Sequence, residues 1–271
     1  MEILEYTFFR NALLGLMLIS VASAVIGTYV IVRRLMFVSG GVTHACFGGL
    51  GLGYYLGMNP LLMAGVFAVG SSLGVEWVST RYHVREDSAI SVVWALGMAI
   101  GVLFIFLTPG YVPELNNFLF GSILTISQTD LLIFAAYLLV LLGFVGVYFR
   151  PIMACAFDSD FARTIGMPVR LINSAMMVLV SVCIVLTLKL IGIMLLMSLF
   201  AIPQMIAEVF TTRLRPMIAL AVVVSLFCSV AGLFISYYTN VPASATIVLT
   251  LIAAYAVVRI GKEMRKRQCA K

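Results

Sequence analysis

The stretch that decides the fold runs from Arg33 to Gly57 and reads RRLMFVSGGVTHACFGGLGLGYYLG. It opens with two adjacent arginines, continues with apolar residues, and carries one histidine, His44, before glycine recurs at every second or third position. A run of this length can cross a bilayer as a helix, and ionisable side chains inside such runs are costly. The stretch therefore predicts a membrane span whose inner end is marked by the arginines and whose histidine has a polar task.

The composition of the whole chain indicates that this span is one of several. Of the 271 residues, 63% are hydrophobic and only 10% are charged, whereas soluble domains carry about 25% charged residues. The fold class is therefore an all-α, polytopic integral membrane protein. The net charge of +6 is typical of a membrane protein with basic cytoplasmic flanks, and we expect no nucleic-acid partner.

Charges and clusters of proline, glycine and asparagine divide the chain into about nine apolar segments. A helical span needs roughly 20 apolar residues, which predicts about 8–9 transmembrane helices in a single transmembrane domain over residues 1–271. A further apolar piece, residues 117–127, is too short to cross and predicts a re-entrant or surface helix. The predicted segments are residues 8–32, 38–58, 61–79, 88–107, 129–149, 171–187, 190–210, 216–236 and 242–258.

The basic residues predict the orientation of these spans. If Arg33 and Arg34 are placed on the inside, 15 of the 17 lysines and arginines return to that side, including a basic tail over residues 259–271. Cytoplasmic loops are enriched in basic residues, so we expect a cytoplasmic C-terminus and an external N-terminus. The longest polar connection, residues 150–170, then lies in the cytoplasm.

His44 and the neighbouring Thr43 are the candidate metal contacts within the spans. Neutral imidazole is a common ligand of zinc and related first-row ions, although a histidine between helices can instead serve as a hydrogen-bonding group. The glycines that follow, from Gly48 to Gly57, repeat with small-x-x-x-small spacing. This spacing favours a helix-packing surface, with a pore-lining role as the alternative.

Motifs for enzymatic chemistry are missing from the sequence. The one Gly-Lys pair, Gly261 and Lys262, lacks the other residues of a phosphate-binding loop. Neither a Gly-x-Ser-x-Gly elbow nor a His-Glu-x-x-His pair occurs. We therefore expect no enzymatic activity and no cofactor on this chain.

Several segments, taken in order, resemble the permease subunits of bacterial zinc/manganese ABC importers. Those permeases show two arginines followed by a Gly-Asp-Ala-x-Ser-His-Ala-x-Leu-Pro-Gly stretch, and the order and spacing of the matches hold over nearly the whole chain. The matching residues are Arg33–Arg34, Ser39–Gly49, Glu86–Ile90, Leu119–Leu124, Phe157–Arg163, Leu190–Leu196, Ile202–Pro203, Ser236–Tyr238 and Pro242–Val248.

The resemblance implies a permease in the bacterial inner membrane that imports zinc or manganese, with iron as a further option, by alternating access. It implies a second permease copy in a homodimer, cytoplasmic ATPase subunits that bind the ATP, and an extracytoplasmic metal-binding protein. It also implies that residues 157–168 form a coupling helix on the ATPase. The residues carried over for this role are Phe157, Asp158, Asp160, Phe161 and Arg163.

The chain departs from the family pattern around the histidine. The aspartate four residues before it is Gly40 here, the serine is Thr43, and the later proline is Gly48. A hard carboxylate ligand is thereby lost, which makes a preference for manganese less obvious.

Two other classes of protein are alternatives to the importer. A secondary transporter would need no ATPase and predicts paired intramembrane acids and inverted repeats, neither of which the sequence shows. A membrane-embedded scaffold or enzyme would use the glycines for assembly.

Overall fold

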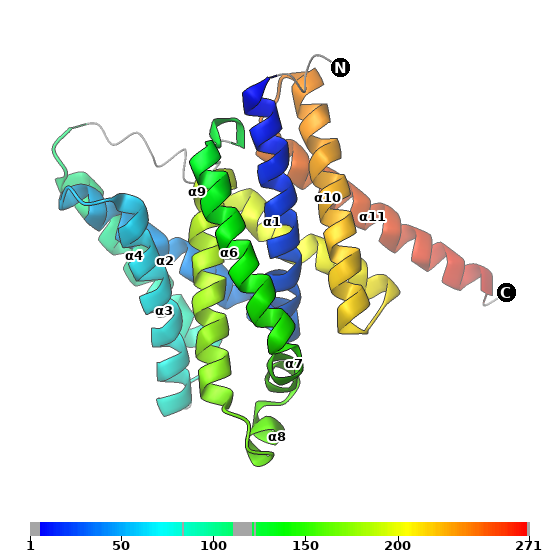
Figure 1. The fold of residues 1–271 in the computed structure, drawn as a ribbon, viewed down its shortest axis with the longest axis horizontal. Coiled ribbons are helices and arrows are strands. Elements are labelled where there is room, and N and C mark those ends of the chain that lie inside the picture. Colours follow the sequence, from blue (N-terminus) through cyan, green and yellow to red (C-terminus); the bar gives the residue numbers. More distant parts are fainter. Residues whose placement is uncertain (1–5, 83, 111–120, 122, 270–271) are drawn as a thin grey trace. The chain divides into compact units, whose positions relative to one another are not determined.

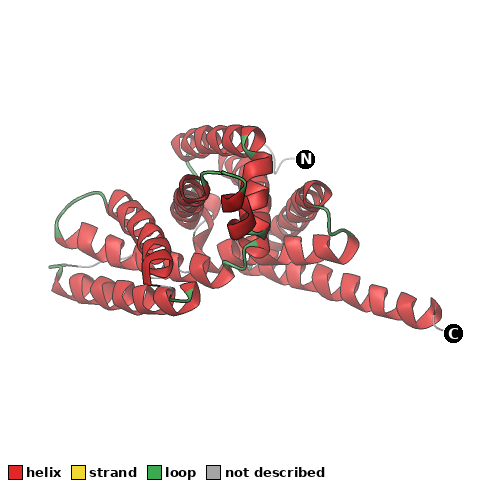
Figure 2. Cartoon of the chain, turned by 90° about the horizontal axis from the view of Figure 1, so that it is seen from below, coloured by secondary structure: helices red, strands yellow, loops and turns green. Residues whose placement is uncertain are grey.

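The computed structural model describes residues 6–82, 84–110, 121 and 123–269, and within these ranges every regular element is a helix (Figures 1 and 2). This agrees with the predicted all-α class. The elements are α1 (Thr7–Val32), α2 (Met36–Tyr55), α3 (Pro60–Tyr82), α4 (Glu86–Leu107), the 3-10 turn η2 (Ile123–Thr125), α6 (Gln128–Val147), α7 (Phe149–Phe157), α8 (Ser159–Thr164), α9 (Val169–Phe210), α10 (Leu214–Thr239) and α11 (Ala243–Cys269).

The predicted membrane segments all have helical counterparts. Seven described helices are long and apolar enough to cross a bilayer. Helix α2 is not among them because its glycines and histidine lower its hydropathy, and α9 contains two predicted segments. The backbone of Gly192, with φ 75° and ψ 174°, interrupts α9, a few residues after the break expected at residues 188–189. This conformation is almost exclusive to glycine.

The described part of the short apolar piece 117–127 does not cross. Residues 123–125 form η2, and Ile126 after it is buried. The side-chain amide of Asn11 donates a 3.1 Å hydrogen bond to the carbonyl of Ile126. Residues 117–120 and 122 of that piece lie outside the described ranges.

The chain divides into two compact units. The first contains residues 1–31, 119–136 and 190–271, and the second contains residues 32–118 and 137–189. The first unit thus holds most of α1, the second half of α9, α10 and α11, and the second unit holds α2 to α4, most of α6, α7, α8 and the first half of α9. A single domain over residues 1–271 stays a prediction.

Helices α1 and α10 are antiparallel neighbours in the first unit. The ring of Phe9 lies 5.5 Å from that of Phe234, near the end of α10. At the other end, Ala24 packs against Ala221 and against Ala207 of α9. Small residues at such contacts let helices approach closely without a hydrophobic drive from water.

In the second unit, α2 lies between α3 and α4, and α3 also contacts the first half of α9. The hydroxyl groups of Ser181 on α9 and Ser72 on α3 share a buried 2.7 Å hydrogen bond. Two turns earlier on α9, Ser174 donates a 2.9 Å hydrogen bond to the carboxylate of Glu76, which lies one turn after Ser72 on α3. Polar bridges of this kind join helices where lipid offers no alternative partner.

Candidate functional site

The glycines of α2 bring its backbone into contact with two helices. A methyl group on Gly48 would lie 2.8 Å from the carbonyl oxygen of Gly97, and one on Gly51 would lie 2.5 Å from that of Gly101, both on α4. On the other side of α2, Gly53 is equally close to Pro60 at the start of α3. The packing interpretation of the glycine stripe is confirmed within this unit. The stripe determines where the side chains of α2 lie relative to α4.

We expect Gly51→Ala to destabilise the protein by about 1–3 kcal/mol, because the new methyl group would press on the backbone of α4. A drop in the thermal unfolding temperature of the purified chain in detergent measures this effect. Gly70→Ala on α3 is the matched control, because a methyl group there meets no atom within 4 Å. Equal unfolding temperatures for the two variants would contradict the close packing of α2 on α4.

His44 projects from this glycine-lined helix onto α4. Its imidazole stacks on the indole of Trp94, with ring centroids 4.4 Å apart and the planes 5° from parallel. Phe37, two turns before His44 on α2, also contacts Trp94, with ring centroids 5.9 Å apart. The histidine is half-buried, and one face of its ring lies against Trp94.

Thr43 has its hydroxyl proton engaged elsewhere. The hydroxyl donates a 2.8 Å hydrogen bond to the backbone carbonyl of Ser39, one turn earlier, and the side chain is fully buried. Its oxygen therefore has acceptor capacity only. Within the described residues, no group of three or more histidine, cysteine, aspartate or glutamate side chains could hold a metal ion. Of the two candidate contacts, His44 is therefore the one with a strong ligand group, its imidazole.

Trp94 is the functional neighbour that sequence reasoning missed. It lies three residues before Gly97, the α4 glycine that contacts α2. A tryptophan one turn from a close glycine contact is a signal that would place its ring beside the facing helix. The pairing with His44 still depends on the register of α2 against α4, which one sequence does not supply.

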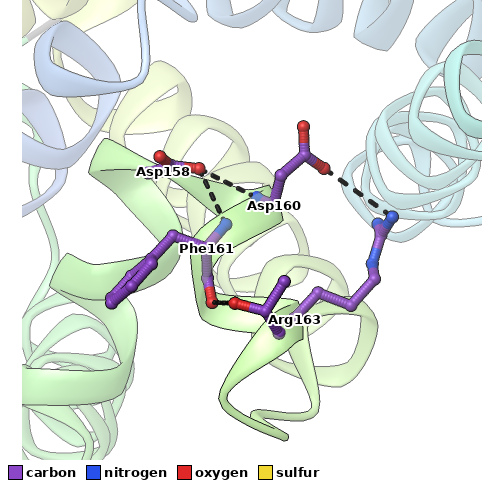
Figure 3. A network of polar contacts seen from close by, with 5 residues as sticks. Asp158, Asp160, Phe161 and Arg163 are labelled. Carbon is purple, nitrogen blue, oxygen red and sulfur yellow. Dashed lines mark hydrogen bonds and ion pairs between the residues drawn. The ribbon is translucent and has the colours of Figure 1, made fainter.

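The predicted coupling residues lie at the junction of α7 and the short helix α8: Phe157 ends α7, Asp158 precedes α8, and Asp160, Phe161 and Arg163 lie in α8. The backbone of Asp158 is extended (φ −148°, ψ 97°), which ends α7, and its carboxylate accepts hydrogen bonds from the amides of Asp160 (3.1 Å) and Phe161 (2.9 Å) (Figure 3). This is an N-cap, in which a carboxylate satisfies amides that have no partner in the first turn. Asp158 thus both ends one helix and begins the next.

The other end of α8 is closed by a glycine. Gly166 adopts φ 79°, its amide bonds the carbonyl of Arg163, and the amide of Met167 bonds the carbonyl of Ala162. These two bonds form a Schellman motif, which requires a left-handed residue and so favours glycine. Caps at both ends let a helix of six residues form without a long run of its own.

The predicted coupling segment, residues 157–168, exposes three large apolar side chains, which together we term the apolar ridge. Phe157 is the last residue of α7, Phe161 lies in α8 and Ile165 directly follows it, and the three side chains are 68%, 60% and 52% exposed. Ala162 is fully buried and anchors the opposite face of α8. Large exposed apolar side chains next to charged groups are characteristic of protein interaction surfaces.

The charges of α8 stand beside this ridge. Asp160 and Arg163 form an ion pair of 3.8 Å, with side chains 90% and 67% exposed (Figure 3). A pair as exposed as this adds little to stability. Both groups are therefore available to a partner.

A mostly buried ion pair joins the starts of α2 and α4 in the second unit. The guanidinium of Arg33, just before α2, lies 3.8 Å from the carboxylate of Glu86 at the start of α4, and both side chains are mostly buried. The charge of Arg33 also reaches α7, where burial raises the pKa of the Cys155 thiol and the guanidinium partly offsets this. The arginine that opens α2 is thus a neighbour of the helix that precedes the coupling segment.

These features define a class of protein: a multi-pass helical membrane protein with a glycine-packed, histidine-bearing span and a capped helix that presents an apolar ridge. The chain belongs to the ABC 3 transport family, whose sequence model matches residues 5–262. It is accordingly an ABC-type permease, a transport subunit rather than an enzyme, as the resemblance implied.

Individual relatives agree with this assignment. The chain is 33% identical to a probable metal transport system membrane protein of Chlamydia pneumoniae, over 87% of this chain and 83% of the relative. It is 29% identical to the manganese transport system membrane protein MntC of Halalkalibacterium halodurans, over 94% and 88%. Among solved structures, PsaBC from Streptococcus pneumoniae in complex with Fab matches with a TM-score of 0.83 and 26% identity, over 95% of this chain and 92% of that one.

Proposed function

We propose that this chain is the permease of an importer that carries a divalent transition metal, manganese or zinc, into a bacterial cell. The relatives named as metal and manganese transport proteins support the metal. Iron stays within the proposal because an imidazole is a ligand for several first-row ions. The energy comes from ATP hydrolysed by partner subunits, since this chain has no phosphate-binding loop.

The observation that carries the coupling part of this proposal is the capped helix α8 with its exposed ridge. A rigid element with fixed ends transmits displacement better than a flexible loop, and Phe157, Phe161 and Ile165 offer the aromatic and aliphatic anchors that interfaces use. The ATPase subunits would seat against this ridge, with Asp160 and Arg163 at its rim. The proposed docking surface is the coupling segment.

The proposed orientation places α8 and the basic tail in the cytoplasm of a bacterium and the N-terminus outside its inner membrane. The distribution of basic residues supports this placement. An extracytoplasmic metal-binding protein would then deliver the ion to the opposite face. The coupling segment lies on the side where ATP is available.

The metal path requires donors from more than one chain. In one copy, His44 offers an imidazole and Gly40 offers no carboxylate. The part of the chain that the structure describes has no group of three or more histidine, cysteine, aspartate or glutamate side chains that could hold the ion, whereas zinc and manganese take four or more ligands. A second copy in a homodimer would supply a second imidazole, and water would complete the shell. Few strong ligands allow the ion to leave as well as bind, which conduction requires.

The test is reconstitution of the transporter. The chain, co-expressed with its ATPase and metal-binding protein in a strain deleted for metal uptake, is expected to restore cellular manganese or zinc, and to retain the ATPase through affinity purification. Metal content measured across manganese, zinc and iron identifies the ion. Uptake by the lone chain in proteoliposomes without ATP would contradict the proposal and favour a secondary transporter.

A further inference from the structure

A polar pocket of about 540 Å³ lies within the second unit, between the last turns of α3 and the start of α9. Its polar lining comes from Glu76, Thr80 and Arg81 of α3 and from Arg170 and Ser174 of α9, and its apolar walls are Leu73 and Trp77. None of these residues belongs to the histidine-bearing span or to the coupling segment. The pocket has no role in the transport mechanism described above.

The pocket places positive and negative charge side by side. The carboxylate of Glu76 accepts a 2.9 Å hydrogen bond from Ser174 and lies near the charges of Arg170 and Arg33. Within the described part of the chain, Arg81 and Arg170 make no ion pair. A ligand with one anionic and one cationic group would satisfy both arginines and the carboxylate.

The side chains beside the pocket are of the kinds that occur where a span meets the lipid headgroups. Trp77 and Tyr82 are 53% and 62% exposed and meet edge to face in the last turns of α3. Tryptophan and tyrosine concentrate at membrane–water interfaces, and arginines near span ends attract anionic headgroups. These residues favour a position of the pocket at one interface of the bilayer.

An apolar stripe on α3 leads away from the pocket into the span. Leu62 and Val66 are 69% and 63% exposed, and a methyl group on Gly70 or Gly74 would meet no atom within 4 Å. The surface of α3 around these two glycines is therefore open. An acyl chain could lie along this surface while its headgroup occupies the pocket.

We propose that this pocket binds the headgroup of a phospholipid that carries a phosphate and a primary ammonium, as in phosphatidylethanolamine. Arg81 and Arg170 bind the phosphate, because guanidinium groups form charge-assisted hydrogen bonds with phosphate oxygens. Glu76, held by Ser174, accepts hydrogen bonds from the ammonium. The carboxylate makes the site selective, because it repels a headgroup whose phosphate is not accompanied by a positive charge.

The test measures lipid retention on the purified full-length chain. After delipidation in detergent, native mass spectrometry counts adducts formed with phosphatidylethanolamine, phosphatidylglycerol, phosphatidylcholine or inorganic phosphate. We expect phosphatidylethanolamine to bind best, and Arg81→Gln or Arg170→Gln to weaken all three phospholipids about tenfold, as the loss of one charge-assisted hydrogen bond implies. Glu76→Gln is expected to remove the preference for ethanolamine over glycerol while keeping phosphate binding.

Matched variants separate the site from general effects. Arg213→Gln removes an exposed arginine that does not line the pocket and is expected to leave every adduct unchanged. Arg81→Lys keeps the charge and is expected to restore most of the binding, which guards against a folding defect.

Three results would overturn the proposal. Equal adduct counts for the wild type and the pocket variants would mean that the bound lipid is unspecific. Inorganic phosphate that displaces the lipid at equal concentration would mean a site for the free ion. A change in the monomer–dimer ratio with unaltered lipid binding would mean that a second copy of the chain covers the pocket.

Discussion

Phe161→Asp is expected to abolish ATP-driven metal uptake while the permease still folds and reaches the membrane. The side chain is 60% exposed, so it contributes little to the core of its own chain, whereas a charge at the centre of an apolar interface is strongly unfavourable. Loss of one aromatic anchor costs about 2 kcal/mol or more, which is about thirtyfold in affinity. Retention of the ATPase on the purified permease and uptake of metal by cells measure the two consequences.

The controls separate docking from folding. Phe161→Tyr keeps the aromatic anchor and is expected to retain both ATPase binding and uptake. Asp158→Ala removes the N-cap and is expected to weaken α8 by about 1 kcal/mol, with a partial loss of coupling. Unchanged ATPase retention by Phe161→Asp would show that the ridge on the coupling segment is not the docking surface.

His44→Ala is expected to lower the kcat/KM of metal uptake at least about tenfold. Loss of second-shell partners alone typically costs 10–100-fold in metal affinity or activity, and His44 would be a direct ligand. The ATPase should still bind, because the coupling segment is untouched. Uptake kinetics for manganese and zinc, compared with ATPase activity on the same preparations, measure the expected separation.

A third variant decides between the metal role and the packing role of this histidine. His44→Phe keeps a flat ring that can stack on Trp94 but has no nitrogen to bind an ion. We expect it to be as deficient in uptake as His44→Ala. Normal uptake by His44→Phe would mean that the ring serves contact between α2 and α4 only.

Most of the membrane spans could be predicted because their limits are local properties of the chain. Charges and prolines interrupt the apolar runs, so helices such as α3 and α4 begin within two residues of the expected positions. The break in α9 was also predicted from the sequence, although Gly192 rather than residues 188–189 carries it. The backbone of α9 has a positive φ at this position, which glycine adopts without steric cost.

The parts that could not be predicted all depend on pairs of residues far apart in the chain. Glu76 accepts a hydrogen bond from Ser174, which is 98 residues away in the sequence. The end of α6 was expected at residue 149, but α6 ends at Val147 and a separate helix, α7, follows. Its buried residues, such as Ile152 and Cys155, pack against other elements, and such packing leaves no signal in a local pattern.

The helix α8 illustrates a middle case. Its composition is that of a polar loop, and only the family resemblance predicted a helix there. The capping residues were nevertheless present in the sequence: Asp158 at the start and Gly166 after the end. Six residues are too few for periodicity to indicate a helix, so only the capping residues indicate where this helix begins and ends.

The stacking of Trp94 on His44 has a spectroscopic consequence. The chain contains two tryptophans: Trp94 lies against the candidate metal contact, and Trp77 lines the polar pocket on α3. Intrinsic fluorescence of the unlabelled protein therefore has one emitter beside each site. Titration with metal and titration with lipid should each perturb a different emitter, so the natural protein carries its own optical probe for both ligands.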